Sequence, residues 1–332
     1  MKLRDFDYSL PPERIAQSPA PARDASRLMV VPLAGGPIEH RTFPDLPKWL
    51  RKGDLLVLND TRVVPARLIL ARQSGGRVEA LLLRRVGERR WEALLDPGRR
   101  LQPGEKLRLE DGSSCRIGER GPKSAWTIEF EVDNGALDRL GRAPLPPYIK
   151  RPDGATPADL ERYQTVYAER PGSIAAPTAG LHFTRELLAR IAAGGVAVER
   201  VTLHVGTGTF LPVRADDVEE HVMESEAYEI PVATLQALDR AQRVVAVGTT
   251  SCRTLEAWAR TGQAKGSTDL FIRPPFEYKV VDGLLTNFHL PKSTLLMLVC
   301  AFAGRERTLA AYEEAVKEKY RFFSYGDASL WI

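Results

Sequence analysis

The sequence predicts a mixed α/β main domain, open and barrel-like, that is interrupted by a small inserted antiparallel β-barrel. Residues 66–132 contain about six short strand patterns separated by turn residues. Residues 151–332 instead alternate between helical and strand patterns, which is typical of an α/β layer. The predicted domains are therefore residues 1–64 together with 151–332, and an insert over residues 65–150.

The first 64 residues mix several element types. A Gly-Gly pair separates two strand-like runs and predicts a hairpin over residues 27–32 and 36–43. A short helix is predicted over residues 45–51. The largely apolar run over residues 54–58 predicts a buried strand.

The insert has strands but no helices between them. Its breaks contain Gly, Pro, Asp and Ser, as at residues 74–76, 103–104 and 111–112. Short strands joined by hairpins expose their edges unless the sheet closes on itself. A small closed barrel is therefore the expected form.

The remainder of the chain supplies the elements of the α/β layer. Helices are predicted over residues 158–168, 185–193, 232–241, 251–260, 294–302 and 306–320. Strands are predicted over residues 196–205, 227–230, 244–247, 268–272 and 322–324.

Composition limits the class of protein. The longest apolar run, residues 295–303, is far shorter than the ~20 residues of a membrane span. The amino-terminal residues carry charges and lack the apolar core of a secretory signal. Three widely spaced cysteines offer no disulfide framework and no structural zinc site. These features predict a cytoplasmic protein without a membrane partner.

Positive charge is concentrated in one segment. The whole chain has a net charge of +4, whereas residues 66–151 contain 18 Lys or Arg and 12 Asp or Glu, a surplus of six. Clustered basic charge favours a polyanionic partner. A well-solvated arginine-rich surface is the alternative.

Two polar motifs follow predicted strands, where α/β folds bind ligands. Asn59-Asp60-Thr61-Arg62 follows the strand at 54–58, with a turn closed by the Asp60 side chain as the alternative. The Gly-Thr-Thr-Ser turn at 248–251 opens a helix, whose amino end suits a carboxylate or ribose. The candidate binding residues are Asp60, Arg62, Gly248, Thr249, Thr250 and Arg253.

Two loops carry histidine. The small-residue loop at 176–184 contains Thr178, His182 and Thr184; its histidine would contact a ligand or cap local backbone, and Thr184 suits a helix start. In the loop at 282–294, apolar flanks would bury Asn287 and His289, so both need hydrogen-bond partners.

Two further motifs are weaker. Residues 204–210 offer close backbone approach and hydroxyls through Gly206, Thr207, Gly208 and Thr209, but they lack a Walker lysine, and a Gly-rich turn is the alternative. Residues 221–226 contain Glu224 and Glu226. Carboxylates that face a cation are favoured over a metal site because no second histidine is nearby, and a solvated acidic turn remains possible.

Taken together and in this order, the motifs resemble the S-adenosylmethionine:tRNA ribosyltransferase-isomerase family of queuosine biosynthesis. The matching stretches are GDLLVLNDTRVVPARL, APTAGLHFT, LHVGTGTF, HVMESEAYEI, VVAVGTTSCRTLE, DGLLTNFHLPKSTLLMLVCAFAG and RFFSYGDASLWI. The resemblance implies an α/β domain with an inserted β-barrel. It implies transfer of the ribosyl group of S-adenosylmethionine, a co-substrate, to the aminomethyl-deazaguanine at the tRNA wobble position. Epoxyqueuosine, adenine and methionine would form, without a metal or redox cofactor.

That chemistry needs a base, an acid for adenine and groups that face a cation. Glu224 and Glu226 are expected near the sulfonium, and His182 or His289 in proton transfer. Ribose and the methionine carboxylate are expected near 206–209 and 248–250, and Arg62 and Arg253 near an anion or the deazaguanine. Asp60, Thr178, Thr184 and Asn287 complete the predicted binding set. The basic insert would hold the tRNA backbone, and a monomer is expected.

Three other functions fit parts of the sequence. An S-adenosylmethionine-dependent tRNA methyltransferase would leave S-adenosylhomocysteine, but the usual glycine-rich first turn is missing. A non-catalytic tRNA-binding protein would suit the basic insert and leave the polar loops unexplained. A metal hydrolase is the least favoured alternative.

Overall fold

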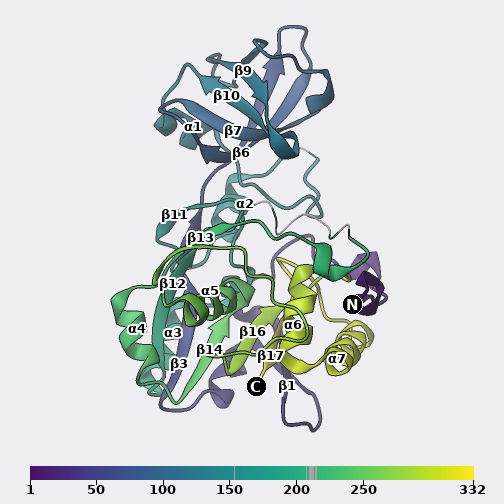
Figure 1. Cartoon of the computed structure of the whole chain (residues 1–332), viewed down its shortest axis with the longest axis vertical. Helices are drawn as coiled ribbons and strands as arrows, with labels where there is room; N and C mark the ends of the chain where they lie inside the picture. The colour runs from purple at the N-terminus through teal and green to yellow at the C-terminus, as the bar shows by residue number, and fades with distance from the viewer. Residues whose placement is uncertain (153, 207, 209–212, 214) are drawn as a thin grey trace. The chain divides into compact units, whose positions relative to one another are not determined.

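The computed structural model describes residues 1–152, 154–206, 208, 213 and 215–332, and the chain forms two units (Figure 1). Unit 1 comprises residues 1–62, 147–150 and 164–332, and unit 2 comprises residues 63–146 and 151–163. The prediction of an α/β main domain with an inserted antiparallel barrel is confirmed. The predicted domain boundaries at 64/65 and 150/151 stay a prediction.

Unit 1 is built on a nine-stranded mixed sheet with the order β15-β13-β12-β3-β14-β16-β17-β1-β2 (Figure 1). At its centre β12, β3, β14 and β16 are parallel, while β13 and β17 run antiparallel to β12 and β16. The strands are β1 (Arg27–Val31), β2 (Glu39–Thr42), β3 (Asp54–Asn59), β12 (Ala197–Leu203), β13 (Glu226–Glu229), β14 (Arg243–Val247), β15 (Lys265–Thr268), β16 (Gly283–Asn287) and β17 (Ala328–Trp331).

Both faces of this sheet are covered, which explains the apolar run of β3. Successive residues of a strand point to opposite faces. Leu56 and Leu58 pack with α3 (Arg185–Ala193), η4 (Phe43–Trp49) and η7 (Thr178–His182) on one face. Leu55 and Val57 pack on the other with α5 (Gly248–Thr261), α6 (Thr294–Ala303) and α7 (Arg305–Lys317). Because both faces of β3 are buried, apolar and polar residues do not alternate along it.

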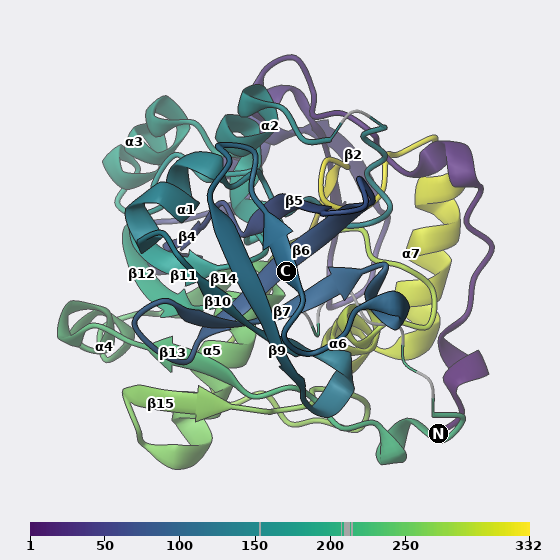
Figure 2. The ribbon, with the colours of Figure 1, turned by 90° about the horizontal axis from the view of Figure 1, so that it is seen from above.

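Unit 2 is a closed six-stranded antiparallel barrel with the order β10-β7-β6-β5-β8-β9, which can be followed in Figure 2. The strands are β5 (Arg67–Arg72), β6 (Arg77–Arg85), β7 (Arg90–Asp96), β8 (Lys106–Arg108), β9 (Ser114–Arg120) and β10 (Trp126–Phe130). Alternate residues such as Leu68, Leu70, Val78 and Ala80 are buried, so the interior is a packed core. The six strands of the prediction are therefore all present.

The remaining elements are short. They include α1 (Asn134–Leu140), α2 (Pro157–Arg162), β4 (Thr61–Val63), β11 (Arg170–Ser173), α4 (Val232–Leu238) and the 3-10 turns η5 (Gly98–Arg100) and η9 (Val218–Glu220). The predicted helix at 45–51 is instead η4, because Pro44 and Pro47 limit the regular helical hydrogen bonds there. Among the described residues no helix has the length and apolarity that a membrane crossing requires.

Glu256 on α5 fixes a loop to the body of unit 1. Its carboxylate is fully buried and accepts hydrogen bonds from the backbone N–H groups of Lys279, Val280 and Val281, at 3.0–3.1 Å. It also pairs with Arg260 at 2.6 Å. Three backbone donors thus depend on one side chain, and each would be left without a partner if it were changed.

We expect Glu256→Gln to lower the free energy of unfolding by roughly 2 kcal/mol, because its amide nitrogen would meet backbone donors and Arg260 would lose its carboxylate. Urea denaturation should show a lower midpoint with an unchanged slope. Glu313→Gln, on the exposed side of α7, is the matched control and should stay within about 0.5 kcal/mol of the wild type. Equal stability of the two variants would contradict the assigned role of Glu256.

Candidate functional site

Polar groups meet at one edge of the unit 1 sheet, which we call the carboxyl edge. It is formed by the residues that follow β3, β12, β14 and β16 and by the first residues of β13 and β17, because those two strands run the opposite way. The edge of a parallel sheet at which the strands end is where α/β folds place ligands. Of the predicted site residues, it carries Asp60, Gly206, Glu226, Gly248, Thr249, Thr250, Asn287 and His289.

Asn59, the last residue of β3, connects three elements at this edge. Its Nδ2 donates to the carbonyl of Leu203 and to Oγ1 of Thr250, each at 3.1 Å. Its Oδ1 accepts from the backbone N–H groups of Thr61 and Leu203, also at 3.1 Å. The buried amide therefore uses its full capacity of two donors and two acceptors, and it fixes β12 and α5 relative to β3.

Glu226 and Arg253 form a buried ion pair, with each side chain 7% exposed. Glu226 Oε1 also accepts from the backbone N–H of Gly206 at 2.8 Å, and Arg253 Nε donates to the carbonyl of Leu270 at 3.2 Å. Arg253 Nη2 is buried and has no partner among the described residues. A buried donor without a partner is costly, so this atom is a candidate for binding an acceptor on a ligand.

Glu224 and Glu226 both lie beside Gly206, and Glu224 also lies beside Gly208. A Cβ placed on Gly206 would lie 3.9 Å from a carboxylate oxygen of each glutamate, which is ordinary contact, whereas one on Gly208 would lie 3.1 Å from Glu224 Oε2. A side chain at Gly208 would therefore crowd the Glu224 carboxylate. Thr207 and Thr209, predicted to contact the ligand, lie outside the described residues.

The first turn of α5 has no side-chain cap from the described residues. The turn begins at Gly248, whose φ of +86° favours glycine, and the N-cap residue Val247 offers no side-chain acceptor. The first backbone N–H groups of the helix form the positive end of its dipole. Thr249 is buried there, and Thr250 is fixed by Asn59.

His182 has a partner on each ring nitrogen. Nδ1 lies 2.8 Å from Ser26 Oγ, and Nε2 lies 3.1 Å from Asn287 Oδ1. Asn287 Nδ2 donates to the carbonyl of Phe323, so its Oδ1 must accept from His182 Nε2, and Nδ1 then accepts from Ser26. Burial lowers the pKa of His182 to about 4. Its predicted part in proton transfer stays a prediction.

His289 is also buried beyond the end of β16. Its Nε2 lies 2.9 Å from Thr286 Oγ1, its carbonyl accepts from Tyr8 OH, and its N–H donates to Tyr312 OH. Burial lowers the pKa of His289 to about 3, so the ring is neutral at physiological pH. Its catalytic role likewise stays a prediction.

The remaining predicted site residues differ in burial and in hydrogen-bond partners. Asp60 is buried and accepts from Thr202 Oγ1 at 2.6 Å, and burial raises its pKa. Thr184 caps α3 by accepting from the N–H of Leu187, Thr178 begins η7, and Arg62 is exposed. The hydrogen bond of Thr184 is therefore made within the protein.

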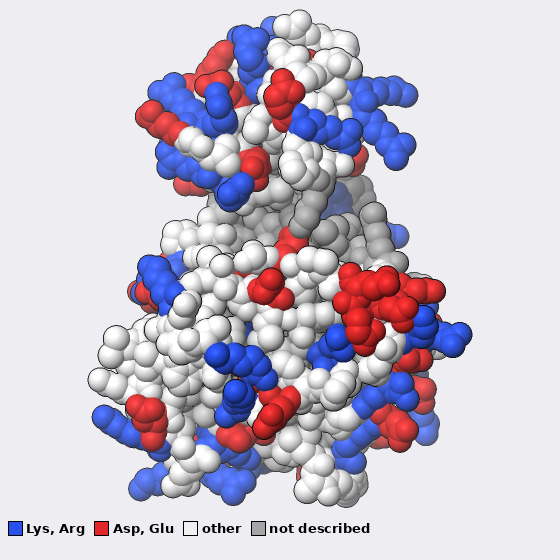
Figure 3. All heavy atoms as spheres, in the orientation of Figure 1, with Lys and Arg blue, Asp and Glu red and all other residues white. Residues whose placement is uncertain are grey.

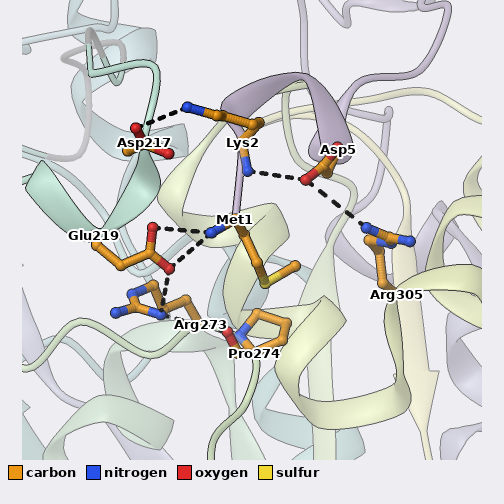
Figure 4. A network of polar contacts seen from close by, with 8 residues as sticks. All are labelled: Met1, Lys2, Asp5, Asp217, Glu219, Arg273, Pro274 and Arg305. Carbon is orange, nitrogen blue, oxygen red and sulfur yellow. Dashed lines mark hydrogen bonds and ion pairs between the residues drawn. The ribbon is translucent and has the colours of Figure 1, made fainter.

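The segment that leads to Glu224 is anchored by the first residues of the chain, a network we call the amino-terminal clasp (Figure 4). The amino group of Met1 lies 2.9 Å from Glu219, and Lys2 Nζ lies 2.8 Å from Asp217. Backbone bonds join Leu3 N–H to the carbonyl of Asp216 and Val218 N–H to that of Met1. Arg273 pairs with Glu219, and Arg305 with Asp5. Partners more than 200 residues apart leave no local sequence signal.

Two residues to which the sequence motifs assigned no role also lie at the carboxyl edge. His204 follows β12, and Ser173 ends β11; both contact Thr61 Oγ1. Among the described residues, no group of three or more His, Cys, Asp or Glu side chains is arranged to hold a metal ion.

Comparison with known proteins agrees with the motifs. A family model described as queuosine biosynthesis protein matches residues 3–331. S-adenosylmethionine:tRNA ribosyltransferase-isomerase from Rubrobacter xylanophilus is 52% identical over 334 residues, which is 100% of this chain and 98% of the relative. The enzyme of the same name from Thermosipho africanus is 51% identical over 99% of each chain.

A solved structure is similar as well. The crystal structure of S-adenosylmethionine tRNA ribosyltransferase from Thermotoga maritima has a TM-score of 0.57 and 41% identity, and the match covers 99% of this chain and 100% of that one. The family expected from the sequence is thus confirmed by a family model and by relatives that match along their whole length. The chain belongs to the queuosine biosynthesis protein family, with S-adenosylmethionine:tRNA ribosyltransferase-isomerases as its relatives.

Proposed function

We propose that this protein transfers and isomerises the ribosyl moiety of S-adenosylmethionine onto 7-aminomethyl-7-deazaguanine at the wobble position of tRNA. Epoxyqueuosine forms, and adenine and methionine leave. The observation that carries the proposal is the family match over residues 3–331, with relatives of that name more than 50% identical. The carboxyl edge supports it, because its charges suit a zwitterionic co-substrate.

S-adenosylmethionine presents a sulfonium, an amino-acid carboxylate, a ribose and an adenine. The sulfonium needs a negative neighbour, and the carboxylates of Glu224 and Glu226, which both approach Gly206, are the candidates. The carboxylate and ribose need donors, which the first turn of α5 and Arg253 Nη2 supply. We therefore assign the sulfonium to the side of these two carboxylates and the anionic end to α5.

The reaction requires proton transfers at these groups. The sulfonium acidifies the neighbouring C5′ protons, and a base that removes one prepares the loss of adenine. Adenine takes up a proton as it leaves, the substrate amine attacks the ribosyl fragment, and methionine departs as the epoxide closes. His182 and His289 remain candidates for these steps, together with Glu224.

The barrel of unit 2 is proposed to bind the tRNA backbone. Several of its arginines are exposed and have no carboxylate partner among the described residues, namely Arg99, Arg100, Arg108 and Arg116. Lysine and arginine side chains project from this unit between the carboxylates in Figure 3. Unpaired guanidinium groups are the ones free to contact phosphates. We propose that the protein acts as a cytoplasmic monomer, which sedimentation with and without tRNA would test.

The proposed reaction is tested by its products. Incubation with S-adenosylmethionine and an anticodon stem-loop carrying aminomethyl-deazaguanine should give adenine, methionine and epoxyqueuosine in equal amounts by mass spectrometry. If S-adenosylhomocysteine forms instead of these products, the protein is a methyltransferase. If a stem-loop that a relative accepts gives neither product, the proposed function is wrong.

Arg253→Lys keeps the positive charge but removes Nη2, so we expect kcat/KM for S-adenosylmethionine to fall roughly 10- to 100-fold, mainly through KM. Arg243→Lys is the matched control. Arg243 also forms a buried ion pair, with Asp54, but at the opposite edge of the sheet. A similar loss in both variants would trace the effect to stability and remove Arg253 from the binding site.

The double variant Arg108→Gln, Arg116→Gln should weaken tRNA binding and lower the slope of log affinity against log salt by about two, one for each lost phosphate contact. KM for S-adenosylmethionine should not change. Arg41→Gln with Lys48→Gln changes net charge equally on unit 1 and should leave the slope unaltered. Equal slopes for both double variants would mean that net charge alone attracts the tRNA.

A further inference from the structure

The residues around His204 hold its imidazole ring in one orientation. Nδ1 lies 2.9 Å from Thr61 Oγ1, which lies 2.7 Å from Ser173 Oγ, and Ser173 Oγ accepts from the N–H of Val205 at 2.8 Å. Gly172 borders the ring closely, because a Cβ there would lie 2.8 Å from His204 Nδ1 and Cε1. The ring is therefore fixed by the Thr61 hydroxyl, which Ser173 holds in turn, and by the close approach of Gly172.

The other ring nitrogen of His204 has no partner within the part of the chain that the structure describes. No described residue forms a hydrogen bond with Nε2, and the side chain is half-buried. The residue also lies at the carboxyl edge, where its N–H donates to the carbonyl of Ala227, next to Glu226, and where Gly206 is two residues away. A fixed ring with one free nitrogen is what a general base or acid requires.

The other histidines are less suited to carry a proton. His182 has both nitrogens occupied, His289 is buried and bonded through Nε2, and His40 pairs with Tyr320 and Glu314. His221 is half-buried and stacks edge-on against Phe271, but no hydrogen bond to a described residue orients it. Among the described histidines, His204 and His289 each combine an oriented ring with one nitrogen that no described residue contacts, and His204 is the less buried of the two.

We infer that His204 is the residue that carries the proton in the proposed reaction, an inference that rests on the proposed function. Nδ1–H donates to Thr61 Oγ1, which leaves the Nε2 lone pair free. Nε2 takes a proton from C5′, and the electron pair of that C–H bond is held on the carbon beside the cationic sulfur. That pair forms the C4′–C5′ double bond as the C4′–O4′ bond breaks, and the O4′ electron pair forms a C1′–O4′ double bond as the C1′–N bond breaks. The imidazolium gives its proton to the adenine nitrogen that receives the C1′–N electron pair, and the ring is neutral again.

Three charged groups act on this ring. Burial lowers the pKa of His204 below its usual 6.5, and Arg170 adds to this effect, while Asp60 and Glu229 oppose it by favouring the protonated form. A base of this kind is active when neutral, so kcat/KM should fall as the pH drops through that lowered pKa. The acidic limb of the pH profile would then belong to His204.

The test is His204→Gln, which keeps a polar side chain but cannot carry a proton. We expect adenine release to fall by 10²- to 10⁴-fold while KM for S-adenosylmethionine changes less than threefold. Exchange of deuterium from C5′-labelled S-adenosylmethionine into water should be lost, and so should the acidic limb. Thr61→Val, which removes the hydroxyl that orients the ring, should give a smaller loss of activity. His40→Gln, outside the site, should behave as the wild type.

The experiment distinguishes failure of the His204 assignment from failure of the proposed function. If the wild type forms the products but His204→Gln keeps more than a tenth of its activity or its C5′ exchange, His204 is not the proton carrier. A large loss in His221→Gln with a normal His204→Gln would move the role to His221. If the wild type itself forms no adenine with a competent stem-loop, the proposed function fails, irrespective of His204. Circular dichroism melting of each variant excludes misfolding as the cause.

Discussion

The carboxyl edge depends on the amide of Asn59. A buried amide has two donors and two acceptors to satisfy, and Asn59 satisfies all four within the protein. The bonds hold the ends of β3 and β12 in register and set the first turn of α5 against them. Two neighbouring groups at the edge are positioned by this arrangement: Thr61, whose hydroxyl contacts His204, and Thr250, in the first turn of the helix that contains Arg253. Only Asn and Gln side chains have two donors and two acceptors, and Gln is one methylene longer.

The polar groups of the edge are grouped on the two faces of the sheet. Glu226 and Arg253 lie with α5 on one face, whose neighbouring residue Tyr228 belongs to the core there. His182 and Asn287 lie on the other face with η7. Side chains that alternate along a strand necessarily divide in this way. A ligand across the ends of the strands would meet charged groups from one face and neutral, hydrogen-bonded groups from the other.

The sequence was sufficient for elements with local signals. The apolar β3, the hairpins of the barrel and the glycine that opens α5 were all predicted from neighbouring residues. Partners far apart could not be predicted, such as His182 with Ser26, or Asn287 with the carbonyl of Phe323. The strand expected at 322–324 lies at 328–331, because Phe323 adopts a φ of +71° and turns the chain first. The family resemblance supplied what spacing alone left open.

The pairing of β1 with β17 has a consequence for synthesis. Leu28 lies opposite Ala328 in a parallel pair, so β1, which pairs with β2 on its other side, gains this second neighbour only when residues 328–331 have been made. At 5–20 residues per second, an emerging β1 remains without this partner for on the order of 15–60 seconds. The carboxyl edge near Asn287 is completed by the same late strand. The sheet of unit 1 is therefore completed only after nearly the whole chain has been synthesised.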